Sequence, residues 1–275
     1  MPGANVNGTN IYYEVHGQGE PLVMIMGFGG GCRGWYFQMR VFKKHYRVII
    51  FDNRGIGKSD KAMESYTIRT MASDTLGLMD NLGIEKAHVL GMSLGSLVAQ
   101  EIAIEHPERV MKLILACASI GETEEDDMNE RMVKAFKVKE GPDGVDLRSV
   151  NFEEAMDTVV ALSFNKRLYR MLLTPMSKVY VKMVGVEGHF RQIEAVMGYN
   201  TLDRLHRIKA PTMVLTGTED KIIPPKYSEQ IASLIPHARL VKVEGGSHAL
   251  NIEMRSRFNK EVLEFLQGDY VRQGA

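Results

Sequence analysis

Short apolar runs alternate with amphipathic stretches along most of the chain, and this alternation predicts strands separated by helices. The strand-length runs are nearly continuously apolar, as expected for strands that helices cover on both faces. They are Ile11–Val15, Leu22–Met26, Tyr46–Phe51, Ala87–Leu90, Met111–Cys117, Pro211–Leu215 and Leu240–Val243. Helical periodicity occupies Thr67–Leu82, Leu94–Glu105, Pro225–Leu234 and Asn251–Leu266. The pattern predicts an α/β fold with a mostly parallel, doubly wound sheet.

The interval 119–205 breaks this alternation. It holds an acidic segment, Gly121–Arg131, and apolar residues at helical spacing over Phe152–Phe164 and Lys166–Val184, but no convincing pair of strands. A loop of this length without structure of its own is improbable in a compact domain. We therefore predict a helical cap inserted over 119–205, on a core formed by the remaining residues, 1–118 and 206–275.

Composition and charge narrow the class of protein. The chain has 275 residues, with Lys plus Arg and Asp plus Glu balanced at 34 each, so no overall charge attracts nucleic acid or an anionic membrane. No apolar run reaches the ~20 residues of a membrane span, and the N-terminus lacks the features of a signal peptide. Cys32 and Cys117 lack metal-ligand spacing and are expected to be free thiols. We expect a cytoplasmic protein without metal, nucleic-acid or membrane partners; its oligomeric state stays open.

The strongest chemical signal is Gly91-Met92-Ser93-Leu94-Gly95, directly after a predicted strand and directly before a predicted helix. A sharp turn there holds the serine in a strained conformation, so the positions two before and two after it must be small. Such a turn raises the hydroxyl above the sheet edge and points the N-terminus of the helix at it. The alternative is a chance match to a common pattern, which the strand–turn–helix context disfavours.

A serine hydroxyl is a weak nucleophile unless a base takes its proton, and a third group must hold that base in one tautomer. His248 follows the last predicted strand, at the sheet edge where open α/β sheets bind ligands, and comes after Ser93 in the chain. The other histidines precede Ser93 or lie in polar or helix-flanking segments. Asp220 follows the strand at Pro211–Leu215, and its neighbour Glu219 is the alternative third group. The predicted catalytic residues are therefore Ser93, His248 and Asp220.

Acyl chemistry at such a serine also needs two backbone N–H donors for the developing oxyanion. Leu94 is expected to supply one, because it follows the nucleophile, and Phe28 in the Gly-rich turn 27–31 the other. The alternative for this turn, a phosphate cradle, is disfavoured because the turn lacks the Gly-Lys-Ser/Thr ending of such a loop. The residues expected to contact the substrate are Gly27, Met92 and Trp35.

Methionine is abundant, with 18 residues. Flexible thioethers suit an adaptable apolar pocket, although they serve equally to fill the internal packing of the insertion. The methionines of the insertion that we consider for such a pocket are Met132, Met156, Met171, Met176 and Met183. This composition favours a small to medium, mostly apolar substrate.

These motifs resemble the α/β-hydrolase superfamily over nearly the whole chain. The segment Asp52-Asn53-Arg54-Gly55-Ile56-Gly57-Lys58-Ser59 is similar to the superfamily's D-x-R-G-x-G-x-S loop, which the resemblance implies is structural. Within the superfamily the chain most resembles the branch of 3-oxoadipate enol-lactonases and small-molecule esterases with a helical cap, on the segment from Arg191-Gln192 to Asp203-Arg204-Leu205. Many relatives carry His-Gly where this chain has Met26-Gly27, at the floor of the pocket.

The resemblance implies a serine hydrolase that cleaves a carboxylic ester or lactone through an acyl-enzyme on Ser93, without a cofactor. Carbon–carbon bond hydrolases use the same three residues and are the main enzymatic alternative. A ligand-binding, receptor-like protein on the same fold is the alternative from another class. Serine at the sharp turn argues against the branches that act on halogenated alkanes or epoxides, which need a carboxylate there.

Overall fold

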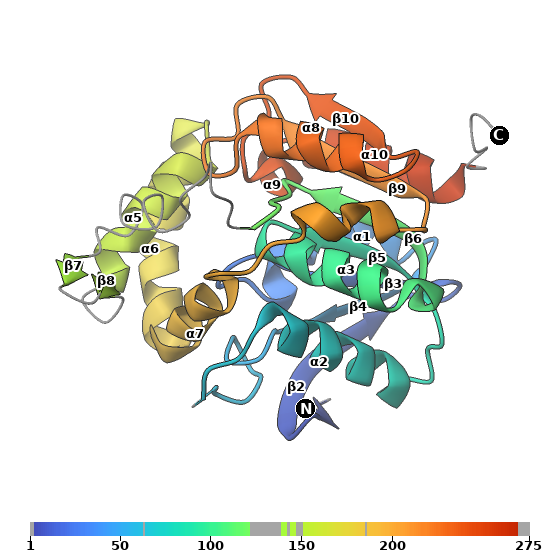
Figure 1. The fold of residues 1–275 in the computed structure, drawn as a ribbon. Helices are drawn as coiled ribbons and strands as arrows, with labels where there is room; N and C mark the ends of the chain where they lie inside the picture. The colour runs from blue at the N-terminus through green and yellow to red at the C-terminus, as the bar shows by residue number, and fades with distance from the viewer. Residues whose placement is uncertain are drawn as a thin grey trace.

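The main sheet of this protein is mostly parallel and runs through the centre of the molecule (Figure 1). The computed structural model describes residues 3–62, 64–121, 139–141, 144–146, 151–184 and 186–268. Over these residues the sheet has eight strands in the order β1-β2-β4-β3-β5-β6-β9-β10. Their bounds are β1 (Gly3–Val6), β2 (Thr9–His16), β3 (Pro21–Ile25), β4 (Arg47–Phe51), β5 (Ala87–Met92), β6 (Val110–Ala116), β9 (Thr212–Gly217) and β10 (Arg239–Val243).

The strand directions confirm the predicted fold class. The pairs β1–β2 and β2–β4 are antiparallel, and all other neighbours in this sheet are parallel. Strand β1 was not expected from the apolar pattern, because only Ala4 and Val6 of its four residues are buried. An edge strand needs little apolar surface, so periodicity does not reveal it.

Helices cover the sheet on both faces. One layer consists of α2 (Ile68–Asn81), α3 (Leu94–Glu105) and α8 (Pro225–Leu234), and the other of α1 (Tyr36–Phe42), α9 (Leu250–Glu253) and α10 (Arg255–Gln267). Short 3₁₀ helices are η1 (Cys32–Trp35), η2 (Pro107–Arg109) and η4 (Leu202–Arg207). Alternate side chains of the strands feed two cores: Val23 and Ile25 face the first layer, whereas Leu22 and Met24 face the second.

One predicted helix differs from the structure. The periodicity predicts a single helix over Asn251–Leu266, but the structure breaks it at Met254 into α9 and α10. Met254 has φ −121° and ψ 37°, which lie outside the helical region. Apolar spacing continues across the break because Leu250 and Phe258 both pack on the same face of the sheet, so the sequence pattern does not show it.

The interval 119–205 contains the helices α5 (Phe152–Ser163), α6 (Arg167–Val184) and α7 (Val186–Val196), which lie together beside the sheet (Figure 1). The predicted helical periodicity of this interval thus corresponds to real helices. The expectation of no strand pair is wrong, because β7 (Lys139–Gly141) and β8 (Gly144–Asp146) form an antiparallel pair. Strands of three residues with charged and glycine positions carry no apolar alternation that a sequence pattern would reveal. Residues 122–138, which include all of the acidic segment except Gly121, lie outside the described residues.

The two ends of this interval meet at the core. Gly121 and Asn200 form an isolated antiparallel bridge, and the N–H of Thr201 donates to the carbonyl of Ile120 at 2.9 Å. The Thr201 hydroxyl donates to Gln100 of α3 at 2.6 Å, in a buried position. The chain therefore leaves and re-enters the core at adjacent points, which fits our proposal that the interval acts as a cap.

Two further observations concern the described residues. No helix among them has both the length and the apolarity that crossing a membrane requires. Cys32 and Cys117 are free and buried. Burial raises the pKa of both thiols, so each stays protonated near neutral pH.

Candidate active site

The candidate residues gather at the carboxyl edge of the parallel strands. Ser93 directly follows β5, and the Gly-rich turn 27–31 follows β3. Asp220 and His248 lie in the loops that follow β9 and β10. Ligands of open α/β sheets bind at this edge, since the loops there converge from several strands. The structure thus brings together residues that are far apart in the sequence.

Ser93, His248 and Asp220 form a continuous hydrogen-bonded series. His248 Nε2 lies 3.0 Å from Ser93 Oγ, and His248 Nδ1 lies 2.8 Å from Asp220 Oδ2. The Asp220 side chain is fully buried, and its Oδ1 accepts the N–H groups of Ile222 and Ile223 at 2.9 and 2.8 Å. An ionised carboxylate only accepts, so Nδ1 carries the imidazole proton and Nε2 faces the serine as an acceptor. This arrangement is suited to removing the serine proton.

Of the two neighbouring carboxylates, Asp220 is the one against the imidazole. Glu219 is exposed, and its Oε2 accepts the side-chain amide of Asn165 at 2.9 Å. The alternative that Glu219 orients the histidine therefore has no support in the contacts of the described residues. Asp220 both shapes its turn, through Oδ1, and holds His248, through Oδ2.

The backbone at Ser93 has the strained conformation that the motif predicts. Its φ is 54° and its ψ is −124°, in a region that residues with a Cβ rarely adopt. A Cβ on Gly91 would lie 2.3 Å from the carbonyl oxygen of Gly95, and one on Gly95 would lie 2.2 Å from that of Ile25. Only glycine fits at these two positions, so the steric argument made from the sequence holds in the structure.

Two backbone segments lie beside the serine. Leu94 is the first residue of α3, and the N–H groups of a first helical turn have no partner within the helix. The turn 27–31 approaches from β3, and a Cβ on Gly27 would lie 2.9 Å from the Cβ of Ser93. Within this turn, Gly29 N–H donates to Gln192 Oε1 at 2.7 Å and Gly30 N–H donates to the carbonyl of Gly27 at 3.1 Å. Those two groups are therefore engaged elsewhere, which leaves our prediction of Leu94 and Phe28 as oxyanion donors in place.

Two residues that we expected to contact the substrate are core residues instead. Trp35 is completely buried and packs in the core cluster of the layer that contains α1 and α10. Met92 belongs to the same cluster and is 5% exposed. The third predicted contact, Gly27, does lie against the nucleophile, as described above.

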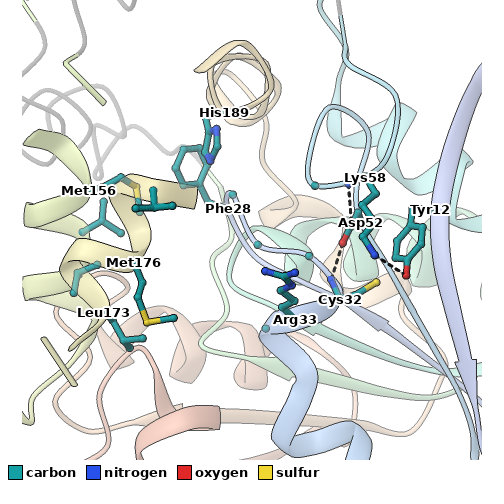
Figure 2. Close-up of a pocket in the computed structure, with 18 of the residues that line it drawn as sticks. Tyr12, Phe28, Cys32, Arg33, Asp52, Lys58, Met156, Leu173, Met176 and His189 are labelled. Carbon is teal, nitrogen blue, oxygen red and sulfur yellow. Dashed lines mark hydrogen bonds between the residues drawn. The ribbon is translucent and has the colours of Figure 1, made fainter. Parts of the chain in front are cut away.

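A cavity of about 750 Å³ lies along the Gly-rich turn and is lined there by Gly29, Gly30 and Gly31 (Figure 2). Ser93, Asp220 and His248 are not among the residues that line it. Phe28, which follows Gly27, lines it, and its ring packs edge-on against His189 of α7 with the ring centroids 5.6 Å apart. One wall is apolar and comes from α5, α6 and the turn between them. Its side chains are Met156, Val159, Val160, Phe164, Leu173, Pro175, Met176 and Val179. This wall supports the expectation of a mostly apolar substrate.

The insertion's methionines have different positions. Met156 and Met176 line the cavity. Met171 is 63% exposed and does not belong to the lining. Met132 and the side chain of Met183 lie outside what the structure describes. Two of these methionines therefore line the cavity, as predicted for an apolar pocket. Valine, leucine and phenylalanine side chains contribute to the apolar wall as much as the methionines do.

The opposite wall of the cavity is polar. Lys58 Nζ donates to the hydroxyl of Tyr12 at 3.0 Å, and this hydroxyl donates to Glu14 Oε1 at 2.9 Å. Arg33 lies between this group and the apolar wall (Figure 2). Asp52, also in the lining, accepts the backbone N–H groups of Cys32 and Lys58 at 2.7 and 2.9 Å.

The loop 52–59 is held by contacts within the core. The Asp52 carboxylate accepts the two hydrogen bonds just described. Arg54 forms a bidentate ion pair with Asp74 of α2, with N–O distances of 2.8 and 2.7 Å. The hydroxyl of Ser59 donates to the Asp52 carbonyl. These contacts agree with the structural role that the family resemblance implies for this loop.

Cys117 is a neighbour of the candidate site that the sequence did not single out. Its Sγ and one atom each of Asp220 and His248 lie within 4.8 Å of one another, a spacing that a metal ion accepts. However, Asp220 and His248 are bonded to each other, and burial keeps the Cys117 thiol protonated. Metal ligation needs the thiolate, so these residues are better suited to their hydrogen bonds.

Gln192 is a second residue that sequence reasoning missed as part of the site. It lies on α7, is completely buried, and holds the Gly-rich turn through Gly29 across 163 positions of the chain. Its neighbour on α7, His189, packs so closely that a Cβ on Gly29 would lie 2.9 Å from the imidazole. No local pattern marks such a residue, because its role depends on a contact between distant segments.

If Phe28 supplies an oxyanion donor, as predicted from the sequence, replacing Gln192 by Leu is expected to lower kcat for the hydrolysis reaction about tenfold, because the buried Gly29 N–H loses its acceptor and the turn carrying Phe28 shifts. Steady-state kinetics measure this effect. The matched control is Gln100→Leu, which also removes a fully buried glutamine, here one that donates to the Ser119 carbonyl at 2.9 Å. The control should lower the melting temperature but change kcat less than twofold. Equal losses of kcat in both variants would show that Gln192 only supports the fold.

Comparisons with known proteins identify the family of the chain. The model of the alpha/beta hydrolase fold family matches residues 20–254, and the chain therefore belongs to this family. Among solved structures, the enol-lactonase from Burkholderia xenovorans LB400 superposes with a TM-score of 0.85 and 28% identity, over 97% of this chain and 100% of that chain.

Two similar curated proteins cover nearly the same length. "Putative carbamate hydrolase RutD" of Azorhizobium caulinodans is 28% identical over 272 residues, which are 96% of this chain and 98% of that protein. "Putative non-heme bromoperoxidase BpoC" of Mycobacterium tuberculosis is 29% identical over 265 residues, 93% of this chain and 97% of that protein. Together with the family, the hydrolase names support an enzyme that hydrolyses a bond in a small molecule.

Proposed function

We propose that the chain is a serine hydrolase that cleaves a carboxylic ester or lactone through an acyl-enzyme on Ser93. One observation carries this proposal: the series Asp220–His248–Ser93, with distances of 2.8 and 3.0 Å, ends on a serine in a strained turn at the start of a helix. The similarity to an enol-lactonase over almost the whole chain supports attack on an ester carbonyl.

The chemistry follows in two steps. In the first, Ser93 Oγ attacks the substrate carbonyl carbon while His248 Nε2 takes the hydroxyl proton, and Asp220 stabilises the imidazolium. The N–H groups of Leu94 and Phe28 stabilise the oxyanion of the tetrahedral intermediate. The carbon–oxygen bond then breaks, and His248 gives its proton to the leaving alkoxide. In the second step, His248 takes a proton from water, the hydroxide attacks the acyl carbon, and the acid leaves as Ser93 regains its proton.

The cavity supports a substrate with a small to medium apolar acyl part. Phe28, next to Gly27 in the Gly-rich turn, lines the same cavity as the apolar wall, so we expect an acyl group bound to Ser93 to extend past Phe28 towards that wall. Burial of each methylene there contributes about 0.8 kcal/mol. Short and medium acyl esters are therefore the expected substrates.

A fluorophosphonate probe tests the proposal. The wild-type protein is expected to be labelled on Ser93, as peptide mass spectrometry identifies, and Ser93→Ala is expected to show neither labelling nor ester turnover. Ser96→Ala is the control, since Ser96 is a fully buried serine in the first turn of α3, which directly follows Ser93, and it should keep both. Turnover of p-nitrophenyl esters should be highest for short and medium acyl chains. A wild-type protein that is not labelled, or a Ser93→Ala variant with undiminished turnover, would exclude a serine hydrolase.

A further inference from the structure

Glu253 is a buried carboxylate that the hydrolysis steps do not use. It lies on α9, after His248, and is 8% exposed. Its Oε2 accepts the hydroxyl of Ser247 and the backbone N–H of Asn165 at 3.0 Å, and its Oε1 accepts the backbone N–H of Lys166 at 2.7 Å. One side chain therefore joins the residue directly before His248 to the start of α6. Three donors from these two segments share one buried carboxyl group, so this junction is held from both sides.

We name the segment 163–166 the α5–α6 turn. It also forms hydrogen bonds with the loops that carry His248 and Asp220. The N–H of Ala249, directly after His248, donates to the carbonyl of Ser163 at 2.9 Å. The side-chain amide of Asn165 donates to Glu219, directly before Asp220, at 2.9 Å. The same amide lies 3.5 Å from the carbonyl of Gly245. The neighbours of both His248 and Asp220 are thus bonded to one turn.

The same turn forms part of the cavity wall. Phe164, in its middle, lines the cavity and packs with Val160 and Ala249 in a small buried cluster. Leu173 of α6 packs against this cluster and also lines the cavity. A ligand in contact with Phe164 therefore touches the segment that Glu253 bonds to the loop carrying His248.

We infer that Glu253 is a positioning residue, which couples the apolar wall of the cavity to His248 through the α5–α6 turn. The inference rests on the proposed serine hydrolase function. Proton transfer between Ser93 and His248 needs the imidazole in place to within a fraction of an ångström. Ser247 is completely buried and bonded to Glu253, so the carboxylate fixes the backbone next to His248. Contact of an acyl group with Phe164 restricts the motion of the α5–α6 turn. Because Glu253 bonds this turn to Ser247, the position of His248 is restricted as well.

The variant Glu253→Gln breaks this coupling with almost no change in volume. The site offers donors to both carboxylate oxygens, whereas an amide has one oxygen and one NH₂ group. If the NH₂ replaces Oε1, it faces the N–H of Lys166; if it replaces Oε2, it faces the N–H of Asn165. In either orientation two donors meet, so one side of the junction opens.

The experiment compares Glu253→Gln with Glu261→Gln in the full-length protein. Glu261 is a matched control because it is a buried carboxylate, on α10, that pairs with Arg239 and Arg257. Fluorophosphonate labelling of Ser93 and kcat/KM for p-nitrophenyl acetate and hexanoate are measured below the melting transition. Labelling of Glu253→Gln is expected to be about tenfold slower, because a displaced His248 removes the proton of Ser93 less efficiently. In addition, the ratio of kcat/KM for hexanoate to that for acetate should be about fivefold lower than in wild type, since we expect only the longer acyl chain to reach Phe164. Glu261→Gln should keep the wild-type rates and ratio.

The outcomes separate this inference from the proposed function. If wild type is labelled and Glu253→Gln keeps the wild-type labelling rate and ester ratio, Glu253 positions nothing and only the serine hydrolase proposal stands. If wild type is not labelled, the proposed function itself fails. Should Glu253→Gln not fold, Ser247→Ala decides, because it removes the hydroxyl that joins Glu253 to the residue before His248 and keeps both bonds of Glu253 to the α5–α6 turn. A lowered hexanoate-to-acetate ratio in Ser247→Ala supports the coupling, and an unchanged ratio overturns it.

Discussion

Asp220→Asn is expected to lower kcat for ester hydrolysis by about 10⁴-fold while the protein stays folded. Two backbone N–H groups, of Ile222 and Ile223, point at Oδ1 and require an acceptor there. The amide oxygen of the asparagine takes that position, so its NH₂ faces His248 Nδ1. Nδ1 must then accept, the imidazole proton moves to Nε2, and Nε2 no longer accepts the proton of Ser93. The loss therefore comes from the wrong tautomer of His248. Steady-state kinetics measure it, and an unchanged circular dichroism spectrum shows that the variant is folded.

Glu219→Gln is the control for this prediction. Glu219 is the adjacent carboxylate and is exposed, and its glutamine variant still presents an oxygen to Asn165. Its kcat should fall by much less, by at most about fivefold, as expected for a side chain that does not touch the base. Similar losses in both variants would mean that the loop as a whole, rather than the carboxylate on Nδ1, sets the activity.

The positions of Ser93 and its flanking glycines follow from local sterics, which is why the sequence predicts them. Their requirement arises within one turn, where Gly91 and Gly95 would each clash if they carried a Cβ. The order of Ser93, Asp220 and His248 along the chain follows from parallel strands, whose ends meet at one edge of the sheet. Both arguments need only short motifs and the strand pattern, and both agree with the observed distances.

The residues that sequence reasoning missed act through contacts between distant segments. Gln192 reaches Gly29 across 163 positions, and Glu253 reaches Lys166 across 87. Neither has a spacing or a neighbour that marks it, since a buried Gln or Glu in a helix looks like any surface polar residue. Trp35 shows the opposite error. A large aromatic residue near a Gly-rich turn is a reasonable pocket residue, but whether its ring faces the loops or the core depends on the packing of α1.

Ser93→Gly is expected to abolish ester turnover and, at the same time, to be more stable than Ser93→Ala. Both variants lose the hydroxyl that we propose as the nucleophile, and this loss is expected to lower kcat by about 10⁶-fold. They differ in the backbone, because φ 54° and ψ −124° cost a residue with a Cβ about 1–3 kcal/mol, whereas glycine adopts them freely. The higher entropy of glycine in the unfolded chain offsets about 0.5–1 kcal/mol of this gain.

The comparison with Ser93→Ala isolates the backbone term, since both variants lose the same hydroxyl and its bond to His248. The net difference in the free energy of unfolding is about 1 kcal/mol, or about 2–4 °C in melting temperature for a chain of this size. Thermal melts of the two variants measure it. A Ser93→Gly variant no more stable than Ser93→Ala would show that this turn stores no strain, and that Gly91 and Gly95 are needed only to avoid clashes. The expected result would mean that the packing of β5 and α3 holds the serine in a conformation that its own backbone disfavours, which keeps its hydroxyl fixed in front of His248.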